Sequence, residues 1–554
     1  MNDPGGNGVE LFWDKPHNIW PIDKEGNLQM GTERLDFEDL LQAAVFVITD
    51  CCYMLLNRFK YYCLMLQPGF LKPPFSLDKK VIFGIAFYFL CMAVIAFTAK
   101  GTSDEGDSIS HYLFAKTAWK YKEHFFNHWA KPVYVLMAFP FAQFGLIGVK
   151  LMNVLLNCAS LWFTYKMAVQ LKIKLPWIPA LLLASIPMYN FLSLGGLTEP
   201  MCACLLIAGL LLLVKEKWIA GIILLSFLPF VRSEGLLMLS VVFVYLIYQS
   251  KYQYLPLLAT GHLFYSIAGY FYYNDLLWVF NKMTYATFSS AYGQGNWMHF
   301  INSLPEILGT AQVILFYVGM LYGFILVIRF FRKQIVASEV PELFLLFGSV
   351  AVYFIAHSAF WALGIFNSGG ILRVMVAIMP LIALVNYRAL EYLFAFINNW
   401  RTQNKCIIIA TGWAILYPFS GHKFAYNWQR DFQPKADQYA QQELVKWLES
   451  VDPDYKNHTF YFETVYISEL LNIDWFDTSK RKRLLDSFVK NEFTPGDYLV
   501  WDDWFAVVEA HISLESLEKD QRLQKLKIFE HKDYWGKTRS TVLFRWKGDV
   551  TDEK

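Results

Sequence analysis

Three carboxylates stand within four residues, Asp104, Glu105 and Asp107, directly after a long apolar run. Acidic groups held close together at a membrane surface raise one another's cost of ionising and are poised for proton transfer. The segment continues as an aromatic and basic stretch that reaches His128 and Lys131. We interpret it as the catalytic loop of a membrane enzyme, with a carboxylate taking a proton from an attacking hydroxyl.

Each polar residue of this loop also has a structural interpretation. The carboxylates, with Ser108, are suited to capping the helix that follows them. Lys131 would either contact lipid headgroups or bind a phosphate, and Pro132 fixes the turn after it. His128 would be a hydrogen-bonded structural residue or a ligand, although no standard spacing for metal ligands is present.

Four further polar residues interrupt the apolar pattern: Glu199, Arg232, Glu234 and Arg373. Glu199 stands at the start of a helix, where the helix dipole would stabilise its negative charge. Arg232 and Glu234 would form a structural ion pair, or Arg232 would bind a phosphate through its guanidinium. Arg373 opens a helix, where backbone N–H groups favour an anion. We expect all four on the same side of the membrane as the acidic loop.

The composition explains what must position these residues. The chain has 554 residues, 55% of them hydrophobic and 17% charged, against about 25% charged in soluble domains. This indicates a polytopic α-helical membrane protein. The net charge is +2, which argues against a nucleic-acid partner. The eight cysteines lie in or beside apolar stretches and indicate neither a disulfide framework nor a zinc site.

The apolar runs predict about eleven transmembrane helices, if the short run 133–145 lies along the outer surface. The runs are 81–99, 147–165, 176–195, 198–214, 217–231, 235–249, 253–272, 309–328, 341–362, 371–386 and 405–420. Lysines before the first run place that end inside and the loop 100–132 outside. For residues 41–66, which contain charges, we favour an interfacial amphipathic helix over a span.

Three regions follow from this pattern. Residues 1–80 are an N-terminal tail with the interfacial helix, 81–420 the transmembrane catalytic domain, and 421–554 a small soluble α/β domain on the outer side. In the last region, we predict strands at HTFYFET, GDYLVWDD, QKLKIFEHK and STVLFRW. Helices are expected at KADQYAQQELVKWLESV and near 506–519.

The chain resembles the GT-C superfamily of lipid-phosphate-sugar glycosyltransferases, in particular the branch with protein O-mannosyltransferases and lipid A aminoarabinose transferases. Asp104-Glu105 after the first span is similar to that family's acidic motif, and His128-Trp-Ala-Lys131-Pro132 to its His/Lys-Pro element. Other similar elements are Phe144-Gly145 with Lys150, Thr198-Glu199-Pro200, and Arg373 to Pro380. The second proline common in the family is missing after Pro132. The resemblance covers most of 81–390.

The resemblance implies an inverting transfer of a sugar from a polyprenyl or dolichyl phosphate to a glycan, lipid or protein acceptor on the extracytoplasmic face. Asp104 would be the base, and Lys131, Arg232 and Arg373 would neutralise the leaving phosphate. Glu105 and Glu199 would position the acceptor, a metal or a neighbouring base, and Glu105 counts with Asp104 as a catalytic residue. Asp107, His128 and Glu234 are expected to bind substrate.

The metal requirement stays open, since the sequence names no cofactor and neither requires nor excludes a divalent metal. The main alternative function is a transporter or flippase of lipid-linked sugars. Transporters place charges near the bilayer midplane and often show repeats with broken helices, whereas here the charges cluster at one face. For the location, the sequence favours the inner membrane of a bacterial cell envelope over the endoplasmic reticulum.

Overall fold

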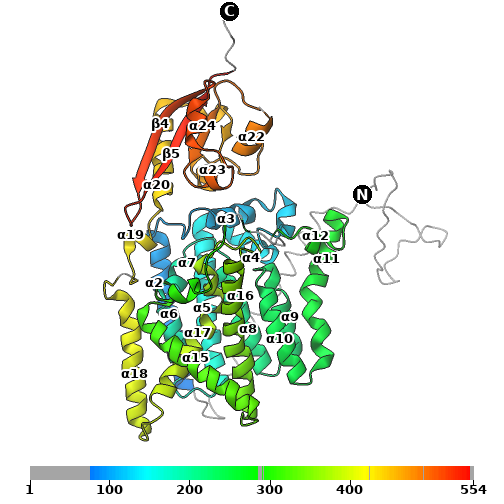
Figure 1. The fold of residues 1–554 in the computed structure, drawn as a ribbon, viewed down its shortest axis with the longest axis vertical. Coiled ribbons are helices and arrows are strands. Elements are labelled where there is room, and N and C mark those ends of the chain that lie inside the picture. Colours follow the sequence, from blue (N-terminus) through cyan, green and yellow to red (C-terminus); the bar gives the residue numbers. More distant parts are fainter. Residues whose placement is uncertain (1–74, 285–289, 291, 423, 491, 549–554) are drawn as a thin grey trace, which may run out of the picture. The chain divides into compact units, whose positions relative to one another are not determined.

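The computed structural model describes residues 75–548 except 285–289, 291, 423 and 491. The predicted interfacial segment 41–66 lies outside the described residues. Helices dominate the first part of this range (Figure 1). The α-helices up to residue 416 are α2 (Phe75–Thr98), α3 (Asp107–Thr117), α4 (Pro132–Ala142), α5 (Leu146–Gln170), α6 (Ile178–Ala184), α7 (Pro187–Leu192), α8 (Glu199–Val214), α9 (Trp218–Ser226), α10 (Gly235–Tyr248), α11 (Thr260–Tyr273), α12 (Trp278–Asn281), α13 (His299–Asn302), α14 (Leu304–Leu308), α15 (Thr310–Phe331), α16 (Ser349–Leu363), α17 (Met379–Leu393) and α18 (Trp400–Leu416).

Each of the eleven predicted apolar runs lies on helical structure. Among the described residues, five helical stretches are long and apolar enough to cross a membrane. They are Leu77–Thr98, Leu146–Gln170, Thr310–Phe331, Ala337–Leu363 and Leu372–Leu393. The prediction of about eleven spans goes beyond these five, because runs such as α8, α9 and α10 form helices shorter than a straight crossing needs.

The expected single helix over 176–195 is wrong. The chain forms α6 and then α7, which begins at Pro187. Proline has no N–H to donate and pushes the preceding residue into extended backbone. Ile186 has that conformation, with φ −72° and ψ 118°. The break therefore has a local cause that is visible in the sequence.

Burial separates a central helix from a peripheral one. In the stretch Leu372–Leu393, which is the short 3-10 helix η7 (Leu372–Ile378) followed by α17, 89% of the most apolar window is buried. In α2 the corresponding share is 17%. α17 packs against α15, α6 and α5, and α8 packs against α5, α9 and η7. The helix that carries Arg373 is thus fixed on nearly all sides.

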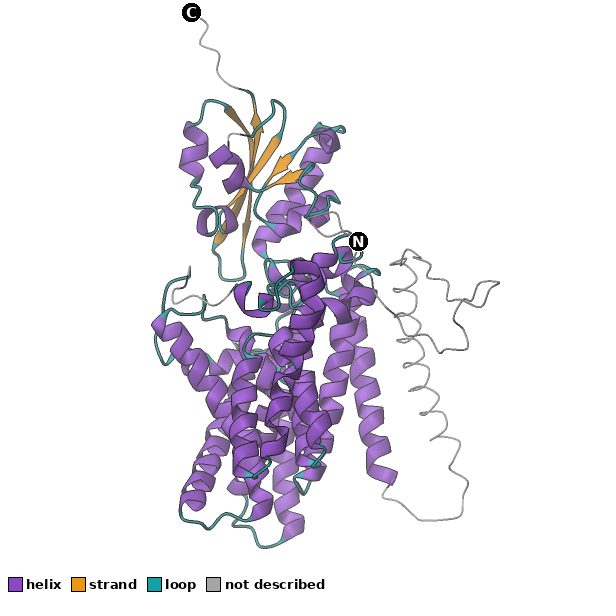
Figure 2. Ribbon diagram, turned by 90° about the vertical axis from the view of Figure 1, so that its right-hand side faces the viewer, coloured by secondary structure: helices purple, strands orange, loops and turns teal. Residues whose placement is uncertain are grey.

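A five-stranded sheet follows the helices (Figure 2). Its strands are β1 (Phe460–Tyr461), β2 (Arg481–Lys482), β3 (Tyr498–Asp502), β4 (Leu523–Lys532) and β5 (Thr538–Trp546), in the order β2-β1-β3-β5-β4. β1 pairs with β2 and β3 in parallel, and the other pairs are antiparallel, with an irregularity between Lys525 and Lys527. The four predicted strands are confirmed. β2 was not predicted, because its two residues, Arg481 and Lys482, are both basic and show no preference for strands.

Helices cover both faces of the sheet. They are α20 (Ala436–Val451), α21 (Val465–Leu471), α22 (Leu484–Lys490), α23 (Phe505–Val508) and α24 (Leu514–Lys519), and the short α19 (Trp428–Asp431) precedes them. α20 and α21 share one apolar core with the sheet, and α22, α23 and α24 share a second. The strand side chains alternate between these cores, as a period of two requires. The single helix expected near 506–519 is wrong: His511, at φ 56°, separates α23 from α24.

Candidate active site

The acidic loop joins α2 to α3 and turns its first carboxylate inward. Asp104 is 8% exposed. Its Oδ1 accepts the N–H of Ser108 at 3.0 Å, so the residue does cap α3, as the structural interpretation predicts. Its Oδ2 accepts a hydrogen bond from Arg373. Capping and pairing use different oxygens, so the structural and the functional interpretations are compatible.

Arg373 connects three carboxylates that lie far apart in the sequence. Its Nη1 bonds Asp104, its Nη2 bonds Asp107, and its Nε lies 3.2 Å from Glu199 Oε1. A guanidinium suits this arrangement because it presents five N–H donors in a rigid plane. Arg373 belongs to η7, directly before α17. The buried helix η7 therefore holds the carboxylates of Asp104 and Asp107 through Arg373.

Glu199 extends the group to a second arginine. Arg232 Nη1 lies 2.7 Å from Glu199 Oε1, and Arg232 Nη2 lies 2.8 Å from Glu234 Oε1. Nη1 also donates to Thr198 Oγ1 at 3.0 Å. We call Asp104, Asp107, Glu199, Arg232, Glu234 and Arg373 the carboxylate–guanidinium cluster. Its members come from four separate segments of the chain: residues 104–107, the start of α8, residues 232–234 and η7.

Lys131 adjoins this cluster. It precedes Pro132 at the start of α4, with φ 67°, and is buried. Its Nζ donates to Ser233 Oγ at 3.1 Å, and Ser233 stands between Arg232 and Glu234 in the sequence. Burial lowers the pKa of Lys131 to about 8, although Glu234 opposes this change. An ammonium at this place is charged near neutral pH but close to losing its proton.

Burial and neighbouring charge give the acidic groups different proton affinities. Burial raises the pKa of Asp104 to about 7, and Arg373 only partly offsets this rise. Burial alone would raise the pKa of Asp107, but Arg373 and His111 together lower it. Burial also opposes ionisation of Glu234, yet Arg232 holds its pKa at about 2. The pKa of Asp104 is therefore suited to accepting and releasing a proton near neutrality.

Two predicted site residues do not join the cluster. Glu105 makes no ion pair or hydrogen bond in the part of the chain that the structure describes. His128 packs on the rings of Trp278 and Phe230, at centroid distances of 4.9 and 6.3 Å. Burial lowers the pKa of His128 to about 4. The two residues thus adjoin the site without contacting its arginines.

One residue near the cluster, His111, escaped the sequence analysis, whereas His357 was expected on the same face as the acidic loop. His111 lies one turn after Asp107 on α3, is buried, and stacks on Trp129 at 4.8 Å. Its Nδ1 has no hydrogen-bond partner among the described residues, and the same holds for Nε2 of the buried His357. The spacing of Asp107 and His111, which puts both on one helix face, was the signal that could have identified His111.

The donor groups do not fit a resident metal ion. No group of three or more His, Cys, Asp or Glu side chains within the described ranges is arranged to hold one. In the cluster, Asp104, Asp107 and Glu199 each face the Arg373 guanidinium. A cation would have to displace this positive group, so we derive no step through a metal.

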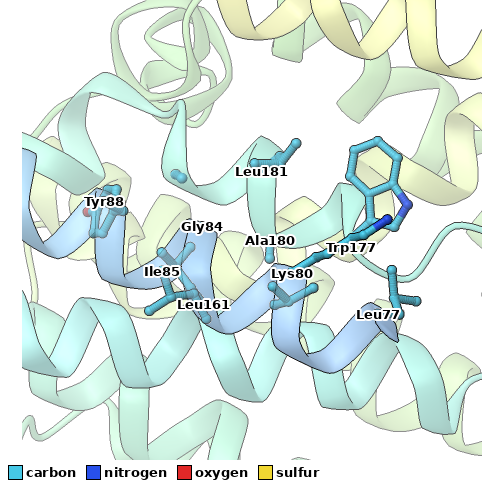
Figure 3. A pocket seen from close by; sticks show the side chains of 11 residues that line it. Leu77, Lys80, Gly84, Ile85, Tyr88, Leu161, Trp177, Ala180 and Leu181 are labelled. Atoms are coloured by element: carbon cyan, nitrogen blue, oxygen red, sulfur yellow. The ribbon is translucent and has the colours of Figure 1, made fainter. Parts of the chain in front are cut away.

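A groove of about 490 Å³ lies elsewhere, between α2, α5 and α6 (Figure 3). Its lining is apolar except for Lys80 and the Tyr88 hydroxyl, and it includes no residue of the carboxylate–guanidinium cluster. The lining residues are Leu77, Lys80, Val81, Gly84, Ile85, Tyr88, Leu161, Trp177, Ala180, Leu181 and Ala184. The groove is thus separate from the candidate active site.

Comparison with known sequences is sparse. No protein-family model matches the chain. A catechol-2,3-dioxygenase of Bacillus subtilis (strain 168) is 46% identical over 44 residues, which are 8% of this chain and 15% of the dioxygenase. Because the match spans so little of either protein, it supports no statement about fold or activity.

Solved structures give a clear fold. ArnT from Cupriavidus metallidurans, bound to undecaprenyl phosphate, matches with a TM-score of 0.51 and 9% identity, over 84% of this chain and 98% of that chain. The mycobacterial arabinofuranosyltransferase AftD covers 84% of this chain and 40% of its own at TM-score 0.45 and 12% identity. The oligosaccharyltransferase AglB from Archaeoglobus fulgidus covers 86% and 75% at TM-score 0.45 and 13% identity. We base the fold on ArnT alone: the chain has the GT-C fold seen in ArnT, and five of its described helical stretches are long and apolar enough to cross a membrane.

Proposed function

We propose that this protein is a membrane glycosyltransferase that takes a sugar from a polyprenyl or dolichyl phosphate and passes it to an acceptor hydroxyl on the extracytoplasmic face. The observation that carries the proposal is Asp104, a buried carboxyl with a pKa of about 7, held beside Arg373 in a chain with the GT-C fold. A proton acceptor and a site for an anionic leaving group lie next to each other.

The reaction would be a single inverting displacement. The acceptor oxygen forms a bond to the anomeric carbon while the bond from that carbon to the phosphate oxygen breaks. The acceptor proton passes to the carboxylate of Asp104. The departing phosphate keeps the electron pair, and Arg373, Arg232 and Lys131 balance its charge. The proton then leaves Asp104 for water before the next turnover.

The remaining cluster residues would hold the charged groups in place. Glu199 lies against both arginines and would fix their relative position, while Asp107 and Glu234 each hold one guanidinium. Glu105 and His128 would contact the acceptor or donor beside the cluster. Residues 81–420 would form the catalytic domain and 421–554 an extracytoplasmic α/β domain. Since ArnT was found with undecaprenyl phosphate, we favour a polyprenyl donor and a bacterial inner membrane.

The test is transfer by the purified protein from a mixture of radiolabelled polyprenyl-phosphate sugars. We expect Asp104→Asn to abolish label transfer while the protein still inserts and binds donor. Glu342→Gln is the control, because Glu342 is also buried in an ion pair, with Arg388, outside the cluster. Near-wild-type transfer by Asp104→Asn would refute the base assignment. Donor binding with neither transfer nor hydrolysis in the wild type would favour a transporter.

A further inference from the structure

The acidic loop contacts the chain at the start of α20. This helix begins the segment 436–546 that contains the sheet, which we call the sheet-containing segment. The N–H of Gly101 donates to the carbonyl of Phe432 at 3.0 Å. A Cβ on Gly101 would lie 2.6 Å from the carbonyl oxygen of Gln433, so the two backbones approach as closely as a glycine allows. Residues more than 300 positions apart are thus in direct contact at the base of the loop.

Gln438 makes the central connection. It stands in the first turn of α20 and is 0% exposed. Its Nε2 donates to Thr102 Oγ1 at 2.8 Å and to the backbone carbonyl of Asp104 at 3.0 Å. Thr102 Oγ1 in turn donates to the same carbonyl at 2.5 Å. Two donors therefore fix the backbone of the proposed base.

The other end of the Gln438 amide is fixed as well. Its Oε1 accepts the N–H of Lys435 at 3.1 Å, which caps α20. A side chain held at both its oxygen and its nitrogen has one rotamer, so it transmits the position of α20 to the loop. Because the Asp104 side chain must meet both Arg373 and the acceptor, a shift of its backbone would displace the carboxylate.

Two further contacts attach α3 and the turn after it to the same segment. Tyr112 donates to Glu469 Oε1 at 3.4 Å, and Lys120 Nζ lies 2.7 Å from Asp474 Oδ2. The lysine is 44% exposed, and exposed ion pairs contribute little to stability. These contacts limit the movement of α3, but they do not touch the loop backbone at Asp104. That role falls to Gln438.

We propose that Gln438 is a positioning residue for transfer: through it the sheet-containing segment sets the place of the Asp104 carboxylate. This inference rests on the proposed function and deepens it. It gives the sheet-containing segment an indirect role in the chemical step, beyond any role in acceptor binding. Gln438 hydrogen-bonds the backbone carbonyl of Asp104 and not its carboxylate.

The test compares Gln438→Met with Gln441→Met, a change of the same kind at an equally buried glutamine of the same helix. Gln441 Oε1 accepts from Thr464 Oγ1, within the sheet-containing segment, and Gln441 has no hydrogen bond to the loop among the described residues. A misplacement of about 1 Å can cost about 100-fold in rate. We therefore expect Gln438→Met to lower kcat about 10- to 100-fold with KM for the donor within about 3-fold. Gln441→Met should keep kcat within about 3-fold of the wild type.

Hydrogen exchange of the amides of residues 101–108 supplies a readout that does not depend on activity. Faster exchange in Gln438→Met, but not in Gln441→Met, is expected. Should Gln438→Met fail to fold, Thr102→Val removes the other half of the contact and should give the same pattern. Equal kcat and equal exchange in wild type and Gln438→Met, or equal losses in both glutamine variants, would overturn the inference. If the wild type transfers no sugar, the proposed function fails, and the exchange comparison still tests the positional contact.

Discussion

Replacing Arg373 by glutamine separates the catalytic role of the cluster from its contribution to stability. The change leaves Asp104, Asp107 and Glu199 without the guanidinium that faces all three. Removing one partner of a buried ion pair costs about 3–5 kcal/mol, because the other charge stays buried and unpaired. Loss of stability alone would therefore reduce activity, and a matched control is essential.

Arg388 provides that control. It is 13% exposed against 16% for Arg373, and it also contacts carboxylates, those of Glu342 and Glu391. The two arginines are 15 residues apart along η7 and α17, which corresponds to roughly 22 Å or more at the rise of an α-helix. Arg388→Gln should thus destabilise the protein to a similar degree at a place remote from the proposed chemistry.

The assay measures transfer per folded molecule, with the folded fraction taken from size-exclusion chromatography and thermal melts in detergent. Loss of a preorganised group that stabilises developing charge costs about 10²–10³ in rate, so we expect Arg373→Gln to lose at least about 100-fold. Arg388→Gln should stay within about 3-fold of the wild type. A double variant, Arg373→Gln with Asp107→Asn, should recover stability but not transfer. Comparable specific activity in the two arginine variants would refute our assignment of Arg373.

The other predictions concern pH and the close backbone approach. Since burial raises the pKa of Asp104 to about 7, it is mostly protonated below that value, and kcat/KM should rise with pH through about 7. The value of kcat/KM should fall again above about pH 8, where Lys131 loses its charge. Lys131→Arg should remove this decrease at high pH. A kcat/KM that does not change between pH 6 and 9 would contradict both assignments. Gly101→Ala should lower transfer at least about 10-fold, because the new Cβ would meet the Gln433 carbonyl oxygen at 2.6 Å. Gly84→Ala, where nothing lies within 4 Å, should leave activity unchanged, and equal rates in the two alanine variants would show that the loop tolerates displacement.

The location of the elements could be predicted from the sequence because its causes are local. Continuous apolar runs must form helices in a membrane, since every backbone polar group there has to be satisfied within the segment. The strands β3, β4 and β5 were predictable because their runs contain β-branched and aromatic residues, which favour strands. The errors were local as well: Pro187 breaks the run 176–195, and His511 interrupts the expected helix near 506–519.

Membership of the site was partly predictable. Asp104, Glu199, Arg232 and Arg373 were recognisable because a charge within an apolar pattern is costly and needs a reason. The distribution of lysine and arginine among the loops predicted that these residues lie on the same side of the membrane. The pairing of these charged residues with one another could not be predicted from the sequence. Composition and periodicity gave no reason for Glu199 to lie against both arginines, or for His128 to pack on Trp278 instead of joining them.

Only the tertiary structure decided how the proposed base is held. Gln438 is an ordinary polar residue on an amphipathic helix, and the sequence offers no sign that its amide is fully buried against the loop. The proton affinity of Asp104 has the same origin, since its pKa depends on burial by distant segments and on the Arg373 guanidinium. The sequence by itself determined which residues are costly to place in a membrane protein; the packing of remote segments determined which of them meet, because such contacts depend on long-range geometry that no local pattern records.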